Sequence, residues 1–208
     1  MERAPVDAER ARLRSELRAR RRSISASDRI AGAQALAGQL LDLRGLPASG
    51  HVAGYWAMDG EIALHAWQMQ LPPGLTYCLP VLADEGRLGF APWRAGAPLV
   101  TNRFGIPEPD VARSALLSPD SMALVVMPLV GFDARCERLG MGGGWYDRSF
   151  AGIRAGSSAK GAIVPMLVGA AFELQRVDVL PTAPWDVALD AVCTERQTYY
   201  GQPMHEPA

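Results

Sequence analysis

The feature that most restricts the fold is a continuous apolar run at 122–127, which lies between Ser121 and Pro128. A strand of this kind has no polar face, so both of its faces must be covered by other elements. Such strands are typical of parallel sheets on which helices pack from both sides. The run therefore predicts a central buried strand with a layer above it and a layer below it.

The rest of the chain supplies alternating strand and helix patterns around this run. Helices are predicted at 7–22, 62–71 and 145–153. A further helix is predicted to begin after an N-cap at Ser25 and to end before Pro47. Strands are predicted at 51–58, 75–81, 88–93, 162–171 and 188–193, with a loop-rich segment at 94–119 and an irregular tail after Glu195. This alternation indicates an α/β sandwich with a mostly parallel sheet. Since no internal repeat or clear linker occurs, the 208 residues predict one domain, 1–208.

Composition argues against several classes of function. The net charge is −1, which disfavours nucleic-acid binding through bulk charge. Lys160 is the only lysine, so phosphate binding has to rely on arginines and backbone N–H groups. The three cysteines and three histidines are scattered, which argues against a zinc site and indicates a reducing compartment. No apolar run is long enough to span a bilayer and no signal peptide is evident, so we expect a cytoplasmic protein without a membrane partner.

The segment 138–148 is the most informative one for function, because four of the five residues at 140–144 are glycine. Without Cβ atoms, successive N–H groups can converge on one anion, and a helix that begins near Trp145 adds its dipole. Arg138 could supply a fixed positive fork, and Asp147 could hold a magnesium ion that bridges phosphates. A Walker A motif is absent, and the dinucleotide fingerprint needs glycine where Trp145 stands. The segment therefore predicts a phosphate site of another kind.

The string G-F-D-x-x-x-x-R-L-G-M-G-G-G-W-Y-D-R at 131–148 resembles the nucleotide-binding signature of the 5-formyltetrahydrofolate cyclo-ligase family. The basic N-terminal helix and four further segments agree with that family in order and spacing, at 55–61 (Y-W-A-M-D-G-E), 102–109 (N-R-F-G-I-P-E-P), 126–133 and 184–195. The resemblance covers almost the whole chain. It implies a three-layer α/β sandwich with a mostly parallel central sheet (NagB/RpiA/CoA-transferase-like).

The resemblance also implies an enzyme that uses ATP and Mg²⁺ to cyclise 5-formyltetrahydrofolate to 5,10-methenyltetrahydrofolate, with ADP and phosphate as the other products. Phosphorylation turns the formyl oxygen into a leaving group, which N10 of the folate then displaces. The implied partner is this small-molecule substrate, and we expect a monomer. A non-catalytic nucleotide- or folate-binding regulator on the same fold is the alternative, and a sugar-phosphate isomerase or acyl-transferase is a third hypothesis.

By this resemblance, one set of residues contacts ATP. They are Arg10, Arg14, Arg138, Leu139, Gly140, Met141, Gly142, Gly143, Gly144, Trp145 and Tyr146. Arg138 and Tyr146 are implied to be catalytic. Arg18 and Arg21 roughly extend the basic face of the first helix and are expected to lie in solvent.

A second set contacts the folate and the metal. By resemblance, Arg14, Trp56, Glu61 and Tyr146 bind the substrate, although core packing explains Trp56 equally well. Asp147 and Asp186 are the implied magnesium ligands, and Asp190 is a nearby competitor of Asp186.

Three residues depart from the family pattern. Arg10 stands where lysine is usual, and Trp145 stands where tyrosine is common. Cys136 occupies a position that is usually glycine. We expect Cys136 to avoid a strained positive φ, or else the turn to differ locally.

Overall fold

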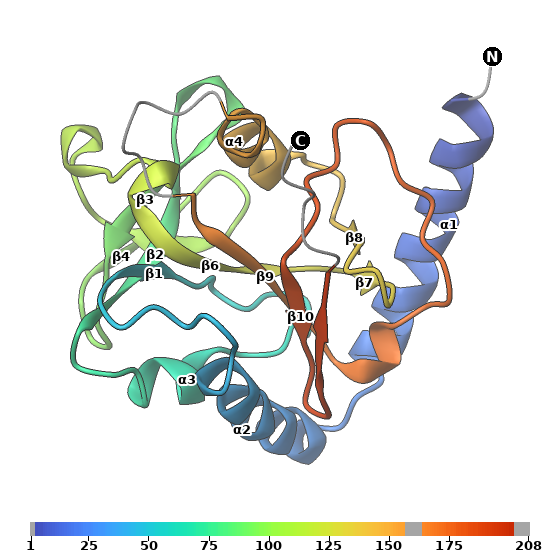
Figure 1. The fold of residues 1–208 in the computed structure, drawn as a ribbon, viewed down its shortest axis with the longest axis horizontal. Helices are drawn as coiled ribbons and strands as arrows, with labels where there is room; N and C mark the ends of the chain where they lie inside the picture. The colour runs from blue at the N-terminus through green and yellow to red at the C-terminus, as the bar shows by residue number, and fades with distance from the viewer. Residues whose placement is uncertain (1–2, 157–163, 202–208) are drawn as a thin grey trace, which may run out of the picture.

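A seven-stranded sheet runs through the centre of the molecule, in the order β11-β10-β9-β6-β1-β2-β3 (Figure 1). The computed structural model describes residues 3–156 and 164–201. The five strands from β10 to β2 are parallel to their neighbours, and an antiparallel strand closes each edge. The strands are β1 (Gly50–Ala53), β2 (Leu75–Leu82), β3 (Leu88–Pro92), β6 (Met122–Pro128), β9 (Met166–Ala170), β10 (Ala191–Cys193) and β11 (Thr198–Tyr200).

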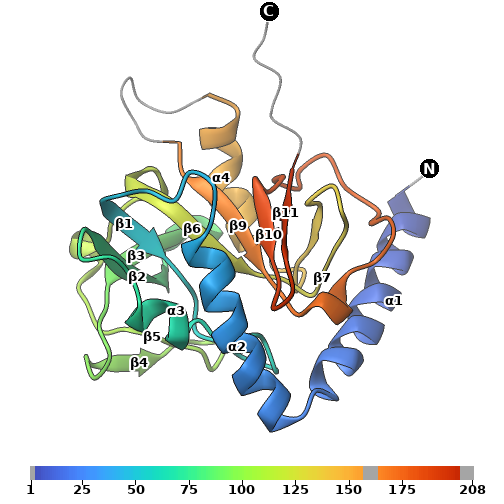
Figure 2. The ribbon, with the colours of Figure 1, turned by 60° about the horizontal axis from the view of Figure 1, so that its bottom comes forward.

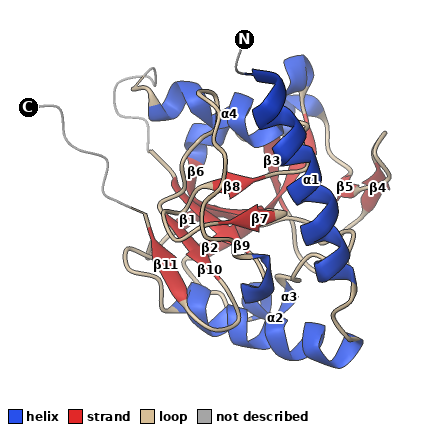
Figure 3. Cartoon of the chain, turned by 90° about the vertical axis from the view of Figure 1, so that its right-hand side faces the viewer, coloured by secondary structure: helices blue, strands red, loops and turns tan. Residues whose placement is uncertain are grey.

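Helices cover both faces of this sheet. Figures 1 and 3 show α2 (Ala26–Leu41) and α3 (His65–Met69) on one face and α4 (Trp145–Arg154) on the other. The long helix α1 (Arg3–Arg22) stands apart from these layers, beside the end of the sheet (Figure 2). None of the helices in the described ranges is long and apolar enough to cross a membrane. The predicted three-layer α/β architecture with a mostly parallel sheet is confirmed.

Strand β6 is buried on both faces, as its apolar run predicts. Leu124 and Val126 pack into the core under α2 and α3, whereas Val125 and Met127 pack into the core under α4. Successive side chains of a strand point to opposite faces, so one continuous apolar strand contributes to both cores. The same alternation makes β6 the natural centre of the sheet.

Helix α2 begins as the sequence predicts. The Ser25 hydroxyl accepts a hydrogen bond from the Asp28 N–H at 3.1 Å, which satisfies one of the free donors of the first turn. The predicted first helix, at 7–22, also forms, as part of α1.

Several elements differ from the sequence-based expectation. The predicted strand at 51–58 ends at Ala53, and the predicted helix at 62–71 is reduced to α3. The segment 94–119 contains a short hairpin of β4 (Leu99–Thr101) and β5 (Pro107–Pro109). Of the strand predicted at 162–171, residues 162–163 lie outside the described residues, and the observed strand is β9.

The expectation of an irregular tail after Glu195 is wrong for Thr198–Tyr200, whereas residues 202–208 lie outside the described residues. Residues of β11 pair antiparallel with β10, from Thr198 opposite Cys193 to Tyr200 opposite Ala191. A three-residue strand has too few residues for a visible period. Threonine and tyrosine nevertheless favour strands once a partner edge is available.

The turn around Cys136 adopts the conformation that the sequence analysis expects this residue to avoid. Cys136 has φ 63°, and its N–H donates to the Asp133 carbonyl at 3.0 Å. The side chain is fully buried. The turn thus keeps the geometry that a glycine would favour, and the packing of the thiol offsets part of the left-handed strain.

We predict that Cys136→Gly changes the free energy of unfolding by no more than about 1 kcal/mol, because relief of the strain offsets the lost packing. Cys136→Val should be less stable than Cys136→Gly by at least about 1 kcal/mol, because a β-branched side chain tolerates the left-handed region worst. Urea unfolding of the two variants measures this order. A valine variant as stable as the glycine variant would contradict it.

Candidate functional site

The residues predicted for function lie where the parallel strands β6 and β1 end. After β6, the chain forms a hairpin of β7 (Gly131–Phe132) and β8 (Arg138–Leu139), then the glycine segment 140–144, then α4. Figure 1 shows β7 and β8 between the sheet and α1. Ligands of open α/β sheets bind at the carboxyl ends of the strands, so this arrangement places the glycine segment at the favoured edge.

The glycine segment exposes its backbone donors. Gly142 has φ 98° and Gly144, the N-cap of α4, has φ 64°, which are left-handed values that favour glycine. None of the N–H groups at 140–144 donates a hydrogen bond to another described residue. Free N–H groups next to a helix N-terminus form a site for an anion.

Two arginines of α1 reach this segment or its surroundings. The Arg14 Nε donates to the Gly140 carbonyl at 2.8 Å, and its guanidinium lies over Gly142, where an added Cβ would be 3.7 Å from Cζ. Arg10 donates to both carboxylate oxygens of Asp186, at 2.5 and 3.0 Å, and to the Pro181 carbonyl at 2.9 Å. Arg14 keeps both terminal nitrogens free of hydrogen bonds to described residues, so it can bind an added anion.

Arg138, Tyr146 and Asp147 form a second group at the start of α4. Arg138 forms an ion pair with Asp147, and its Cζ lies 5.8 Å from the centre of the Tyr146 ring. The Arg138 Nε is buried and has no hydrogen-bond partner among the described residues. Burial, with the Glu61 charge second, raises the pKa of Tyr146, so its hydroxyl stays protonated at neutral pH. A protonated hydroxyl and a guanidinium that is paired with Asp147 therefore lie in the same group.

The two predicted magnesium ligands differ in their free oxygens. The Asp147 Oδ1 accepts hydrogen bonds from Arg138 and, at 3.2 Å, from the Val187 N–H. Its Oδ2 accepts none from described residues. Both oxygens of Asp186 accept from Arg10, and Oδ2 also accepts from the Ala183 N–H at 2.8 Å. No group of three or more His, Cys, Asp or Glu that could hold a metal occurs in the described ranges. Of the two, Asp147 is thus the carboxylate with an oxygen that accepts no hydrogen bond from described residues.

Asp190, the competitor of Asp186, is used elsewhere. Its carboxylate pairs with Arg154, with one contact at 3.0 Å, and accepts from the Leu167 N–H at 2.7 Å. These bonds tie the last turn of α4 to the sheet. Asp186, in contrast, is adjacent to Val187, whose N–H binds Asp147.

Glu61 sits in a tight turn that follows β1. Asp59 and Gly60 have φ 51° and 78°, and the Glu61 N–H donates to the Met58 carbonyl at 2.9 Å. Its carboxylate accepts from the Met58 N–H at 3.0 Å and lies 3.8 Å from the Arg21 Nη1. Burial raises the pKa of Glu61 even though this N–H and Arg21 favour the charge. A buried carboxylate with spare acceptor capacity is suited to binding N–H groups of a ligand.

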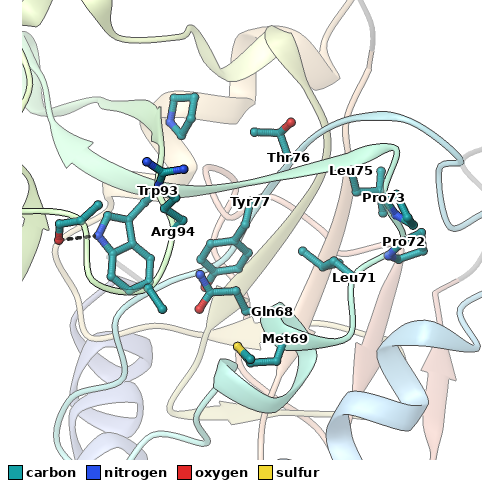
Figure 4. Close-up of a pocket in the computed structure, with 13 residues that line it drawn as sticks. Gln68, Met69, Leu71, Pro72, Pro73, Leu75, Thr76, Tyr77, Trp93 and Arg94 are labelled. Carbon is teal, nitrogen blue, oxygen red and sulfur yellow. Dashed lines mark hydrogen bonds between the residues drawn. The ribbon is translucent and has the colours of Figure 1, made fainter.

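Trp56 is 37% exposed and is therefore not a core residue. Its ring meets the edge of Trp93 at 5.8 Å between centroids. Trp93 also borders a surface hollow of about 620 Å³, which Figure 4 shows beside α3 and β2. None of the residues predicted for the site lines this hollow.

Sequence analysis missed an arginine cluster around Asp59. Arg18 donates to Asp59 Oδ2 at 2.8 Å, Arg21 donates to the same oxygen at 2.9 Å, and Arg22 donates to Oδ1 at 2.5 Å. The expectation that Arg18 and Arg21 lie in solvent is wrong, because Arg21 is fully buried and also binds the Leu129 carbonyl at 3.2 Å. The spacing of these arginines in the sequence indicates that they share one helix face. It does not indicate that Asp59 is their acidic partner.

The fold and this edge define an α/β protein with a candidate anion site, lined by arginines, at the carboxyl ends of its parallel strands. The chain belongs to the 5-formyltetrahydrofolate cyclo-ligase family, whose model matches residues 6–195. It is 33% identical to the 5-formyltetrahydrofolate cyclo-ligase of Haemophilus influenzae over 183 residues, which cover 86% of this chain and 94% of that protein. It is 31% identical to the Escherichia coli K12 protein of the same name over 186 residues, covering 88% and 98%.

Solved structures of two proteins share the fold. The NMR structure of Aquifex aeolicus 5,10-methenyltetrahydrofolate synthetase matches with a TM-score of 0.77 and 24% identity, covering 96% of each chain. The 5,10-methenyltetrahydrofolate synthetase of Mycoplasma pneumoniae matches with a TM-score of 0.66 and 19% identity, covering 90% of this chain and 99% of that one.

We predict that Asp59→Asn lowers the free energy of unfolding at pH 7 by about 2 kcal/mol, because the buried Arg21 loses a charged partner. Burial opposes the Asp59 charge, but hydrogen bonds from Arg18 and Arg22 outweigh it and lower the pKa of Asp59 to about 2. A lowered pKa stabilises the fold above the ordinary pKa of aspartate, and this contribution is lost as the pH falls.

The difference between wild type and Asp59→Asn should therefore be constant from about pH 7 to pH 5 and shrink as the pH falls from about 4 toward 2. Urea unfolding across this range measures it. Asp84→Asn, which removes an exposed pair with Arg113, is the control and should change stability by less than about 1 kcal/mol. An Asp59→Asn effect that does not depend on pH would contradict the assignment.

Proposed function

We propose that this chain catalyses the ATP- and Mg²⁺-dependent cyclisation of 5-formyltetrahydrofolate to 5,10-methenyltetrahydrofolate. The observation that carries the proposal is that one helix, α1, holds two loops at the same edge of the sheet. Arg14 binds the glycine segment, and Arg18 and Arg21 bind the turn that carries Glu61. The first loop suits a polyphosphate and the second suits a ligand rich in N–H donors. Action as a cytoplasmic monomer stays a prediction from the sequence.

The chemistry requires both ligands at one place. The formyl oxygen attacks the terminal phosphorus of ATP, so an O–P bond forms and the bond to ADP breaks. N10 then attacks the formyl carbon, the C–O bond breaks, and phosphate leaves with the proton of N10. Transfer of a phosphoryl group depends mainly on positioning and on neutralising charge.

The described side chains can do both. The free N–H groups of the glycine segment and the terminal nitrogens of Arg14 bind phosphate oxygens. Arg10, held by Asp186, adds positive charge behind them. Arg138 adds positive charge beside Asp147, and the protonated Tyr146 hydroxyl donates a hydrogen bond to charge that develops on the transferred group.

Asp147 fits a magnesium ion, because its Oδ2 is free and Mg²⁺ takes one or two carboxylates together with phosphate oxygens and water. When bound, the ion neutralises negative charge on the phosphates. Asp186 is committed to Arg10, so we propose that it acts by holding that arginine and leaves direct ligation to Asp147.

On the folate side, we assign two contacts. Glu61 accepts hydrogen bonds from the N–H and amino groups of the reduced pterin. Trp56, which is partly exposed, offers a ring on which the pterin or the benzoyl group can stack.

Purified protein with MgATP and 5-formyltetrahydrofolate should produce the ultraviolet absorbance of the methenyl product. Asp147→Asn should reduce kcat at least about a hundredfold at saturating ATP, because the variant loses the carboxylate charge beside the phosphates. Near-ultraviolet circular dichroism checks that the variant keeps its fold. Saturable nucleotide binding by wild type without turnover would favour the non-catalytic regulator, and an unchanged rate in Asp147→Asn would remove that residue from the site.

We predict that Glu61→Gln separates stability from function. Because burial raises the pKa of Glu61, its charged form weakens the fold as the pH rises through that pKa. The glutamine variant should thus be as stable as wild type or more stable at pH 7, whereas KM for 5-formyltetrahydrofolate should rise about tenfold or more. Thermal unfolding and steady-state kinetics measure the two effects. Lower stability with an unchanged KM would show a structural role only.

A further inference from the structure

The hairpin of β4 and β5 carries the segment 102–109, to which the proposed reaction gives no role. Its tip is built by one side chain, since the Asn102 Oδ1 accepts from the N–H groups of Phe104, at 2.9 Å, and Ile106, at 3.1 Å. Gly105 completes the turn with φ 76°. The tip therefore has a defined shape, although it lies at the surface.

A second set of bonds fixes where this tip points. The Glu108 Oε2 accepts from the Asn102 side-chain amide at 3.0 Å and from the Leu82 N–H at 3.2 Å. Leu82 is the last residue of β2, a strand parallel to β1 and β6. Glu108 thus fastens the hairpin to the same carboxyl edge at which the glycine segment lies.

The tip contacts the first residue of α4. The rings of Phe104 and Trp145 meet edge to face with 5.8 Å between centroids. The Arg103 Cζ lies 5.2 Å from the centre of the Phe104 ring and 5.5 Å from that of Trp145. Phe104 is 54% exposed, so this contact positions the arginine more than it buries apolar surface. Trp145 directly follows the glycines. Arg103 therefore contacts the residue next to the predicted phosphate site.

Within the described residues, no carboxylate pairs with Arg103. Arg103 makes no ion pair or hydrogen bond with any described side chain or carbonyl, and its contacts there are with the two rings. Arg148 also lies 5.5 Å from the Trp145 ring and donates to the Gly143 carbonyl at 2.7 Å. The nearest acid in the helix, Asp147, is paired with Arg138. The guanidinium groups of Arg103 and Arg148 thus both lie against the Trp145 ring, and neither forms an ion pair with a described carboxylate. Such a pair of cations is suited to binding an anion.

We propose that the hairpin tip is part of the nucleotide site, and that Arg103 binds the phosphates of a nucleotide held on the glycine segment. The aromatic pair orients the guanidinium before the ligand arrives, so little conformational freedom is lost on binding. This inference rests on the proposed function for the identity of the nucleotide.

The test is Arg103→Gln, a change at an exposed residue that leaves the core intact. Calorimetric titration with a non-hydrolysable ATP analogue and Mg²⁺ should show affinity about tenfold weaker than wild type, because one charge-assisted contact is lost. In steady state, KM for ATP should rise by a similar factor, while kcat and KM for 5-formyltetrahydrofolate stay within about twofold. Phe104→Ala should weaken analogue binding about threefold, because the arginine loses part of its support.

Arg113→Gln is the matched control, since Arg113 is another exposed arginine but pairs with Asp84. It should bind the analogue as wild type does. Unchanged analogue binding in Arg103→Gln overturns the proposal, and so does a rise in KM for the folate alone, which would assign the arginine to the carboxylates of that substrate. Wild-type protein that binds the analogue but does not turn over would refute the proposed reaction and leave the comparison of Arg103 with Arg113 valid.

Discussion

The attachment of helix α1 by its arginines is the interaction on which the candidate site depends. Arg10 binds Asp186, Arg14 binds the glycine segment, and Arg21 binds both Asp59 and Leu129. A fully buried guanidinium such as that of Arg21 destabilises the fold by several kcal/mol if it loses its partners, by analogy with other buried ion pairs (about 3–5 kcal/mol). The helix is therefore held in one position, and it binds two loops that are far apart in the sequence and that carry the candidate site.

This arrangement also determines which acids are free. Asp59 and Asp186 are occupied by arginines of α1, and Asp190 is occupied by Arg154. Asp147 and Glu61 each retain acceptor capacity, which is why they fit a cation and an N–H-rich ligand respectively. Negative charge in this region mainly positions arginines, and the arginines leave a net positive edge for a phosphate ligand.

Particular residues show how far the sequence could be used. The apolar run of β6 and the Ser25 cap depend on local chemistry, so the central strand and the start of α2 could be predicted. Strand β11 could not, because three residues become a strand only when β10 offers them an edge. For Cys136, residue propensity gave the wrong expectation, since this residue has φ 63° in a turn closed by its bond to the Asp133 carbonyl. The placement of the glycine segment followed from its position after a buried strand, whereas the partners of Arg18 and Arg21 did not follow from any local pattern.

The sequence by itself determined the class of fold, the presence of a glycine-rich loop and the supply of arginines around it, because each of these is encoded over a short stretch of chain. Only the tertiary structure decided which arginine meets which acid, which carboxylate oxygen stays free and that the tip of the β4–β5 hairpin stands against Trp145. Those pairings join residues that are up to 176 positions apart in the chain. Their energies depend on burial and distance in the folded state, which no linear pattern specifies.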